Sequence, residues 1–346
     1  MKAVVRESIH PRRMKYKNIR TPTLGNSKNH AIIKVAYAGI CGRDIEHFNS
    51  KLSKNKIPYV PGHEFSGTIY KLPNNYKGKL KVGNKVVCET VAYVCNKCPI
   101  CKSGYYNLCK KRKNIGGSSD GAFSEFVKTP IKYIHQIPKN IELTEAALIE
   151  PLCVCYNALI NNSKNFKKGI TLIIGSGTIG LLTLVLAKYL KIKVVLLTHP
   201  SDKIQVKIAK KIGVNFVYYS EKKAFNKIMS LTRGLGCNLV VDTVGGVNQT
   251  IEFALKAIAP GGQITKIGWF MNKIDVNFDT LIRKNVSLQG SFSHNYEIWE
   301  KCIKLLSQKK ITIKDIITNI YSLNKWDEAY NLLEERKALK ILLKPN

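Results

Sequence analysis

The pattern of apolar and polar positions divides the chain into two parts. From Gly169 to about residue 285, short apolar runs alternate with longer helical patterns, whereas residues 1 to about 150 hold short strand-like runs separated by many turns. The alternation predicts a parallel sheet wrapped by helices, and the turn-rich part predicts an irregular β domain. The expected strands of the second part are 171–174, 193–197, 215–219, 237–244 and 262–268, and the expected helices are 178–190, 201–212, 221–233 and 247–258.

The end of the chain departs from this alternation after about residue 285. Residues 291–308 (SFSHNYEIWEKCIKLLSQ) have a helical pattern, and residues 337–345 (KALKILLKP) have the pattern of a strand. If this tail returns to the first part, the α/β unit is an insertion in it. The division that we predict is 1–150, 151–290, and a returning segment 291–346.

Composition fits a globular protein with a strongly basic surface. The 346 residues suffice for about two domains, and 45% of them are hydrophobic and 23% charged. Lysines occur along the whole chain and bring the net charge to +33, with no block of six like charges. Nucleic-acid binders usually concentrate charge on one face. We therefore expect a solvated lysine-rich surface that attracts phosphorylated small molecules and binds no specific nucleic acid.

Neither a membrane span nor an export signal is expected from the sequence. The longest apolar run, residues 171–187, is interrupted by glycines, a serine and threonines, whereas a spanning helix needs about 18 unbroken apolar residues. Residues 1–18 lack the hydrophobic core of a signal peptide. Ten cysteines, four of them clustered, suit metal binding in a reducing compartment. We expect a cytoplasmic protein.

The sequence IIGSGTIG places a glycine loop directly after a predicted strand. Gly175, Gly177 and Gly180 stand where this strand passes into an apolar helix. Glycines at this spacing permit a tight turn and the close approach of a pyrophosphate to the positive end of the helix. We therefore predict a dinucleotide site here. The other residues of the predicted loop are Ser176, Thr178 and Ile179.

The end of the second strand of this unit bears on which dinucleotide is used. An acidic residue there would accept hydrogen bonds from the adenosine ribose of NAD. This chain has Thr198 and His199 instead, and Asp202 comes too late. A small hydroxyl group with Lys203 nearby would accept a 2′-phosphate. We expect NAD(P) as the cofactor with a preference for NADP, and weaker binding of NAD is the alternative.

Two sets of residues have the composition of zinc sites. Four cysteines occur in CNKCPICKSGYYNLC, residues 95–109, which suits either a finger on nucleic acid or a closed structural site. The second set comprises Cys41 in GICGRD, His63 and Glu64 in VPGHEFSG, and Glu150 in IEPL. A cysteine, a histidine and a carboxylate can bind zinc and leave one position open, as in catalytic sites.

These motifs occur together in one known family. Along the chain they are GICGRD, PGHEFSG, CNKCPICKSGYYNLC, DGAFSEF, IEPL, GSGTIG and GSFSH. The chain resembles the zinc-dependent medium-chain alcohol dehydrogenases, and within them the sorbitol (L-iditol) and galactitol-phosphate branch. The resemblance implies an α/β fold, with a mainly β, GroES-like catalytic domain that carries a zinc lobe at 88–112 and a Rossmann-type doubly wound parallel sheet. It also implies two zinc ions per chain and a homodimer or homotetramer.

The resemblance also implies roles for single residues. Cys41 and His63 bind the catalytic zinc, and which of Glu64 and Glu150 completes the site stays open. In the family the zinc favours the alkoxide of the bound alcohol, and a hydride passes to the nicotinamide. The ligands of the structural zinc are Cys95, Cys98, Cys101 and Cys109, which are packed too tightly for a nucleic-acid finger.

The chain departs from the family at two positions. Where members carry Ser or Thr as the proton relay, this chain has Arg43, whose guanidinium cannot pass a proton at neutral pH. Glu46 or His47 can substitute for it, and Arg43 can bind an anionic part of the substrate or the pyrophosphate. Phe292, placed at the cofactor by the resemblance, is followed by Ser293-His294, where animal sorbitol dehydrogenases have Arg-Tyr at the polyol.

We therefore predict a zinc-containing, NAD(P)-dependent oxidoreductase for a secondary alcohol of a polyol or sugar, anionic substrates included. Within the class, a threonine or butanediol dehydrogenase is the alternative, although IEPL resembles the polyol branch more than the DPF turn of threonine dehydrogenases. In a different class, a basic zinc-finger protein that binds nucleic acid is the remaining alternative.

Overall fold

The computed structural model describes residues 1–51, 57–164, 169–247, 249–270 and 273–345. The chain divides into two units. The first unit comprises Met1–Glu150, Asn295–Lys309 and Ile317–Asn346, and the second comprises Pro151–His294 and Lys310–Ile316. Most of the tail therefore packs with the first unit, and the second unit lies within it along the chain.

The second unit is built on a six-stranded sheet in which every pairing is parallel. The strand order is β12-β11-β10-β13-β14-β15, so the chain starts in the middle, runs to one edge and then continues to the other. Each of the five strands predicted for this part is present, and β15 is an additional edge strand. The strands are β10 (Ile170–Ile174), β11 (Lys193–Leu197), β12 (Phe216–Tyr218), β13 (Cys237–Asp242), β14 (Ile258–Lys266) and β15 (Ser287–Gly290).

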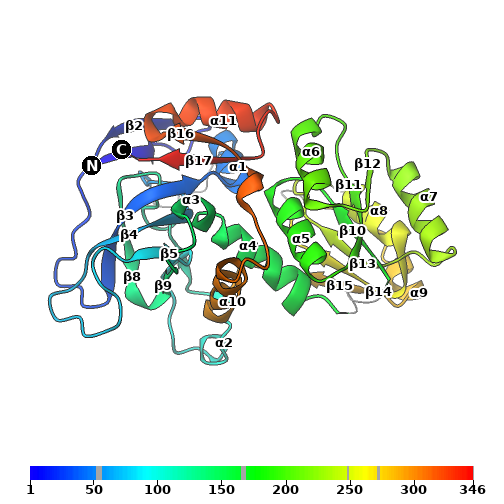
Figure 1. Cartoon of the computed structure of the whole chain (residues 1–346), viewed down its shortest axis with the longest axis horizontal. Helices are drawn as coiled ribbons and strands as arrows, with labels where there is room; N and C mark the ends of the chain where they lie inside the picture. Colours follow the sequence, from blue (N-terminus) through cyan, green and yellow to red (C-terminus); the bar gives the residue numbers. More distant parts are fainter. Residues whose placement is uncertain (52–56, 165–168, 248, 271–272, 346) are drawn as a thin grey trace. The chain divides into compact units, whose positions relative to one another are not determined.

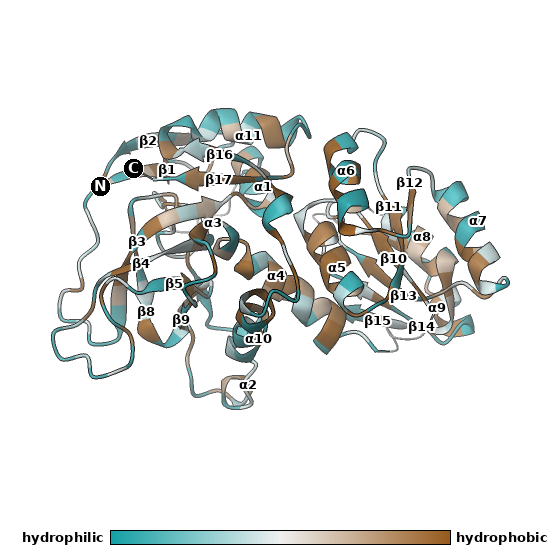
Figure 2. Cartoon of the chain, in the orientation of Figure 1, coloured by the Kyte–Doolittle hydropathy of each residue, from teal (hydrophilic) through white to brown (hydrophobic). Residues whose placement is uncertain are grey.

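The four predicted helices of this unit are present, each with ends within two residues of the prediction. Figure 2 shows that α5 is apolar over most of its surface, and eight of its residues are buried against the sheet and neighbouring helices. In α7 only Ala224 and Ile228, one turn apart, are fully buried. The helices are α5 (Thr178–Tyr189), α6 (Lys203–Ile212), α7 (Glu221–Thr232), α8 (Gln249–Ala257) and the short α9 (Asp279–Arg283).

The first unit is a largely antiparallel β structure that both ends of the chain help to form. In Figure 1 the C-terminal strand β17 lies beside β3, and the two pair antiparallel at Leu343 and Ala38. The main sheet has the order β16-β17-β3-β4-β5-β9, with β8 also paired to β3. The strands are β1 (Lys2–Arg6), β2 (Met14–Asn18), β3 (His30–Gly39), β4 (Glu64–Lys71), β5 (Lys85–Cys88), β8 (Phe126–Pro130), β9 (Ile134–Gln136), β16 (Ile317–Ser322) and β17 (Lys340–Lys344).

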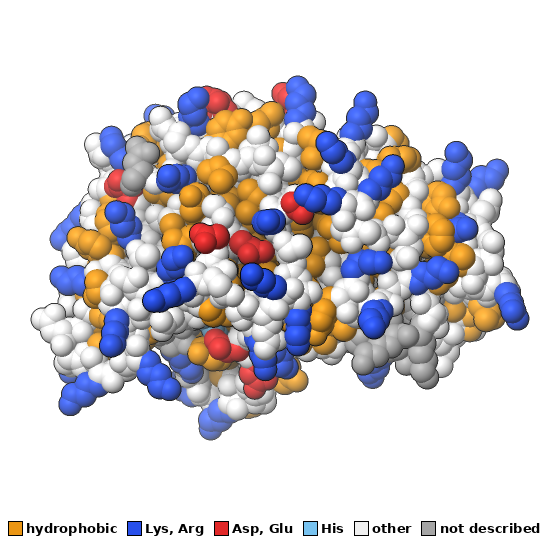
Figure 3. All heavy atoms as spheres, viewed as in Figure 1, with side chains coloured by type: hydrophobic (Ala, Val, Ile, Leu, Met, Phe, Trp, Pro, Cys, Tyr) orange, Lys and Arg blue, Asp and Glu red, His pale blue; other side chains and the backbone are white. Residues whose placement is uncertain are grey.

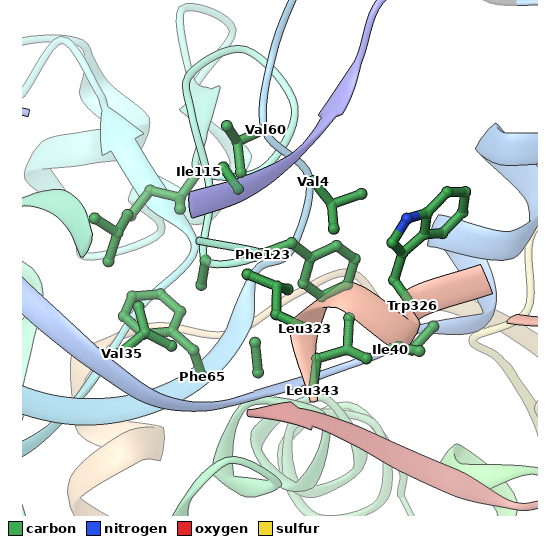
Figure 4. Close-up of a cluster of buried hydrophobic side chains, with 14 of the residues drawn as sticks. Val4, Val35, Ile40, Val60, Phe65, Ile115, Phe123, Leu323, Trp326 and Leu343 are labelled. Atoms are coloured by element: carbon green, nitrogen blue, oxygen red, sulfur yellow. The ribbon is translucent and has the colours of Figure 1, made fainter. Parts of the chain in front are cut away.

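One apolar cluster holds the first unit together. Figure 4 shows the ring of Phe123 among side chains from both ends of the chain, such as Val4 and Leu343. Trp326, the first residue of α11 (Trp326–Glu334), packs edge-on against Phe48 with ring centroids 5.6 Å apart. This burial of side chains far apart in sequence anchors the C-terminal segment on the first unit.

A small lobe with a separate apolar cluster projects from the first unit. It contains β6 (Val91–Tyr93), α2 (Pro99–Lys102) and β7 (Lys113–Asn114). Its cluster joins Val91, Val94, Tyr106 and Cys109 with Tyr133 and is too small to form a core. A lobe of this kind needs a further source of stability.

Lysine and arginine side chains are dispersed over the face of the molecule that Figure 3 shows. On the face drawn in Figure 3 they stand singly or in small groups among polar and apolar side chains, with few acidic residues between them. This distribution agrees with the solvated basic surface that the sequence predicts. Among the described residues, no helix has the length and apolar character to cross a membrane.

Candidate metal centres and dinucleotide site

Three of the four residues predicted for the open zinc centre meet where β3 ends and β4 begins. The two strands pair antiparallel, with Gly39 opposite Glu64. Cys41 is the N-cap residue of α1 (Gly42–Asn49), just beyond Gly39, and His63 directly precedes β4. One ligand atom from each of Cys41, His63 and Glu64 lies within 4.8 Å of the other two.

Asp44, in the first turn of α1, contacts two of these residues. Its Oδ2 accepts a hydrogen bond from the backbone N–H of Cys41 at 2.9 Å, and its Oδ1 lies 3.7 Å from Nδ1 of His63. Burial alone would lower the pKa of His63, but the negative charge of Asp44 raises it well above the ordinary value. A carboxylate in this place fixes the ring of a metal-binding histidine. Asp44 is not among the residues predicted from the sequence, although an acid three residues after an N-cap position is a capping signal.

Glu64 is paired with a lysine from the other end of the chain. Lys340, the first residue of β17, donates hydrogen bonds to the Glu64 carboxylate and, at 2.9 Å, to the carbonyl oxygen of Ile40. The Lys340 side chain is 1% exposed and that of Glu64 is 2% exposed. Burial alone would lower the pKa of Lys340, but the Glu64 carboxylate raises it above the ordinary value. Lys340 was also not predicted. A lysine at the start of an otherwise apolar strand was the feature that could have indicated a buried, paired charge.

Glu150, the fourth predicted residue, is buried near the same centre. It is the second residue of α4 (Ile149–Tyr156). Its negative charge raises the pKa of both His63 and Glu64. The larger causes are burial, Asp44 and Cys41 for His63, and burial and Lys340, which lowers the pKa, for Glu64. Among the described residues it does not join Cys41, His63 and Glu64 in the set whose ligand atoms lie within 4.8 Å. Of the two carboxylates predicted as ligands, Glu64 is therefore the one with an oxygen atom within 4.8 Å of the ligand atoms of Cys41 and His63.

The residues proposed for proton transfer lie together on α1. Nη1 of Arg43 is 3.9 Å from Oε2 of Glu46, one turn further on, and both side chains are partly exposed. Burial and the positive charge of Arg43 lower the pKa of the neighbouring His47, which is therefore a neutral imidazole at neutral pH.

The four clustered cysteines fit a closed zinc site. Their sulfur atoms all lie within 4.8 Å of one another, and Sγ of Cys95 is 3.9 Å from that of Cys101 and 3.6 Å from that of Cys109. Tetrahedral zinc with Zn–S bonds of about 2.3 Å places sulfur atoms about 3.8 Å apart. Backbone N–H groups of Lys97 and Cys98 lower the pKa of Cys95, which favours the thiolate that binds metal.

The glycine loop has the shape that a dinucleotide requires. Gly175 has φ +98°, and a Cβ there would lie 2.7 Å from Oγ1 of Thr243. A Cβ on Gly180 would lie 2.0 Å from the carbonyl oxygen of Gly175, so this glycine lets α5 pack closely on the loop. A Cβ on Gly177, the N-cap residue of α5, would meet nothing within 4 Å. The loop thus leaves free space in front of the helix N-terminus, where a pyrophosphate fits.

The premise that Asp202 comes too late in the chain is wrong. Its Oδ2 accepts hydrogen bonds from Oγ of Ser176 at 2.8 Å and from Oγ1 of Thr198 at 2.9 Å. The turn after β11 brings it there, because the N–H of Asp202 donates to the carbonyl oxygen of His199 at 3.0 Å. The sequence pattern does not reveal this turn. Lys203, the next residue, is exposed at the start of α6.

Phe292, the last residue predicted to contact the cofactor, lies in the second unit. It is 39% exposed and packs against Trp269, with ring centroids 5.8 Å apart. Its contact with a cofactor stays a prediction.

Comparison with known protein families gives two matches along the chain. Residues 27–139 match the family described as "Alcohol dehydrogenase GroES-like domain", and residues 178–308 match the family described as "Zinc-binding dehydrogenase". Together these matches cover more than half of the chain. Their order is that of the two units described above.

Similar proteins extend over the whole length of the chain. A sorbitol dehydrogenase of Halalkalibacterium halodurans is 33% identical over 326 residues, which cover 94% of this chain and 93% of the relative. A D-arabitol-phosphate dehydrogenase of Enterococcus avium is 33% identical over 348 residues, with 100% and 98% covered. The crystal structure of galactitol-1-phosphate dehydrogenase from Escherichia coli superposes with a TM-score of 0.87 at 28% identity, and all of both chains is covered.

Proposed function

The chain belongs to the zinc-dependent medium-chain alcohol dehydrogenases and to their polyol dehydrogenase branch, and from this premise we propose that it oxidises a secondary alcohol of a polyol or polyol phosphate. It is an oxidoreductase that uses zinc and a nicotinamide dinucleotide. The first unit supplies the groups that bind the alcohol, and the glycine loop of the second unit binds the dinucleotide.

The observation that best supports this proposal is the close approach of Cys41, His63 and Glu64. A thiolate, an imidazole and a carboxylate within 4.8 Å of one another form a donor set that leaves a position open for an alcohol oxygen. Zinc bound there supplies Lewis-acid stabilisation of the alkoxide. Lys340 donates a hydrogen bond that orients the carboxylate of Glu64, and the Asp44 carboxylate lies 3.7 Å from Nδ1 of His63, where it can orient the ring. Glu150, buried nearby, is a further carboxylate that can replace Glu64 or orient water.

The alcohol proton leaves through groups on α1. Arg43 cannot accept it, but Glu46 and the neutral His47 both can. Glu46→Gln and His47→Gln separate the two paths. The variant that blocks the path should lower kcat and alter its pH dependence while leaving dinucleotide affinity unchanged. If neither variant lowers kcat, the relay is not on α1.

Arg43 favours the phosphorylated members of the substrate class. It follows the ligand Cys41 by two residues, and its side chain is 38% exposed. A guanidinium suits bidentate binding of phosphate. Arg43→Met should raise KM for a polyol phosphate by about tenfold or more and leave KM for the neutral polyol within about twofold. Equal effects on the KM values of the two substrates would show that Arg43 does not bind the phosphate.

A substrate panel tests the proposed function. Sorbitol, galactitol, arabitol and their monophosphates would be compared with L-threonine and 2,3-butanediol, with both NAD and NADP, by the absorbance of reduced nicotinamide. The highest kcat/KM should belong to a polyol or a polyol phosphate, by about tenfold or more. If threonine or butanediol is the best substrate, the proposal is wrong.

We also propose that the protein is a homodimer or homotetramer. The edge strand β15 is exposed at all four positions, and Leu288 within it is 43% exposed. An open edge with an apolar side chain is a template for pairing with another strand, and two copies of β15 can pair antiparallel by two-fold symmetry. Leu288→Lys should lower the oligomeric mass in light scattering. An unchanged mass would exclude this edge as the interface.

The cytoplasm is the compartment that we propose. A reducing environment keeps the four thiols of the lobe available to zinc. Fractionation of cells that express the tagged protein tests this, and recovery outside the cytoplasm would contradict it.

A further inference from the structure

A buried carboxylate from the start of α6 lies at the end of β11. Asp202 is the N-cap residue of α6 and is 8% exposed. Besides the bonds from Ser176 and Thr198, its Oδ2 lies 3.3 Å from the backbone N–H of His199. The carboxylate is therefore held between the glycine loop and the end of β11, the place where a dinucleotide-binding sheet presents its acid to the adenosine ribose.

The hydroxyl groups of Ser176 and Thr198, which would have to donate hydrogen bonds to a 2′-phosphate, already donate to Asp202. Oγ of Ser176 and Oγ1 of Thr198 each donate to Asp202, and the two hydroxyls also contact one another. A hydroxyl group has a single proton to donate. Ser176 and Thr198 therefore cannot serve a phosphate unless they release the carboxylate.

The charge at this point also opposes a phosphate. A 2′-phosphate next to Asp202 would place like charges together in a partly buried site, where repulsion is screened less than in water. A ribose with a free 2′-hydroxyl can instead donate a hydrogen bond to the carboxylate. Lys203, the residue expected from the sequence to contact the phosphate, is exposed at the start of α6.

We infer that Asp202 takes the place of the strand-end acid and makes the site selective for NAD over NADP. This reverses the cofactor preference expected from the sequence. The inference rests on the proposed function in one respect, which is that a nicotinamide dinucleotide binds at the glycine loop. It concerns the adenosine end of the cofactor and is independent of the substrate.

Binding to the full-length, zinc-loaded protein tests the inference without turnover. Dissociation constants of NADH and NADPH would be measured by nicotinamide fluorescence at two ionic strengths, for wild type, Asp202→Asn and Asp275→Asn. Asn retains an oxygen that accepts from Ser176 and Thr198 but removes the charge. Asp275 is an exposed acid of the same unit and controls for the general loss of one negative charge.

Wild type should bind NADH about tenfold or more tightly than NADPH at both ionic strengths. Asp202→Asn should reduce this ratio about tenfold by strengthening NADPH binding, and Asp275→Asn should leave it unchanged. Equal or tighter binding of NADPH by wild type overturns the inference, as does an equal effect of the two substitutions. If Asp202→Asn does not fold, the wild-type ratio alone decides. Failure to bind either dinucleotide contradicts the proposed function itself, whereas a preference for NADPH contradicts only this inference.

Discussion

At the scale of single residues, Lys340 of the C-terminal strand β17 contacts the open metal centre through its hydrogen bond to Glu64. Its ammonium group and the Glu64 carboxylate are both almost fully buried, and each compensates the charge of the other. A buried pair of this kind is costly to break because one charge remains without its partner. The orientation of Glu64 therefore depends on a residue that follows it by 276 positions.

Lys340→Met should destabilise the first unit by about 3 kcal/mol, because the buried Glu64 carboxylate would lose the lysine that donates a hydrogen bond to it and pairs with its charge. Lys344→Met, an exposed position at the end of the same strand, is the matched control and should have little effect. Denaturant unfolding of the zinc-loaded protein measures both. If the two variants unfold alike, the pair does not stabilise the fold.

Metal ligands are easier to predict from the sequence than the residues that hold them in position. Cys41, His63 and Glu64 lie in short motifs whose chemistry is local, so their meeting could be predicted. The contacts of Asp44, Lys340 and Asp202 are made through a helix cap, a distant strand and a turn. Glu64 and Lys340 lie far apart in the sequence, so no short motif contains both. The turn before α6 has no periodic pattern of apolar residues from which its shape could be predicted.

At the scale of elements, α10 (Tyr296–Ser307) is tied to the sheet of the first unit by a buried histidine. Nδ1 of His135 in β9 lies 2.6 Å from Oε1 of Glu300 on α10, and its Nε2 lies 3.3 Å from Oε1 of Glu89. Trp299 stacks on the ring at 5.2 Å. Burial alone would lower the pKa of His135, but the bonds with Glu300 and Glu89 raise it above the ordinary value.

The stability that His135 contributes should therefore fall with rising pH. With a raised pKa in the folded state, the contribution is complete below the unfolded value of about 6.5 and is lost as pH rises through the folded value. The melting temperatures of wild type and His135→Gln should differ most below about pH 6.5, and the difference should narrow as the pH rises above that value. His10→Gln, at an exposed position, is the control. A difference that is constant across this range would contradict the account.

The cysteine lobe should depend on its metal. Its apolar cluster is small, so much of its stability must come from the four thiolates around zinc. Cys98→Ser should lower the zinc content by about one ion per chain and lower the melting temperature. Lys97→Ser, the exposed neighbour, should change neither. Unchanged zinc content in Cys98→Ser would rule out the closed site.

Elements with a strong apolar period were predicted well, and strands with few apolar residues were not. β10 is buried at all five positions and follows a clear apolar run, and the ends of α5 to α8 were predicted within two residues. By contrast β15 (SLQG) is exposed at every position and carries a single apolar residue. β2 (MKYKN) is similarly polar and exists because it pairs with β1.

At the scale of the whole molecule, the basic residues behind the net charge of +33 occur along the whole chain, and they are dispersed over the face drawn in Figure 3. Such a field attracts anionic substrates over a distance that salt shortens to about 10 Å at 0.1 M. For a polyol phosphate, kcat/KM should fall severalfold between low and moderate ionic strength, and for the neutral polyol it should stay constant. Equal salt dependence for the two substrates would show that the surface charge does not guide the substrate.

We propose that Cys41, His63 and Glu64 form the zinc centre at which an alcohol is oxidised, and that dinucleotide binding does not depend on these residues. The most direct test is His63→Ala, in which zinc content, NADH affinity and turnover are measured on one preparation, with His10→Ala as the exposed control. The account predicts the loss of about one zinc ion per chain, NADH binding within about threefold of wild type, and turnover below about 1% of wild type. Turnover of more than a few per cent of wild type, or an unchanged zinc content, would contradict this assignment of the zinc centre.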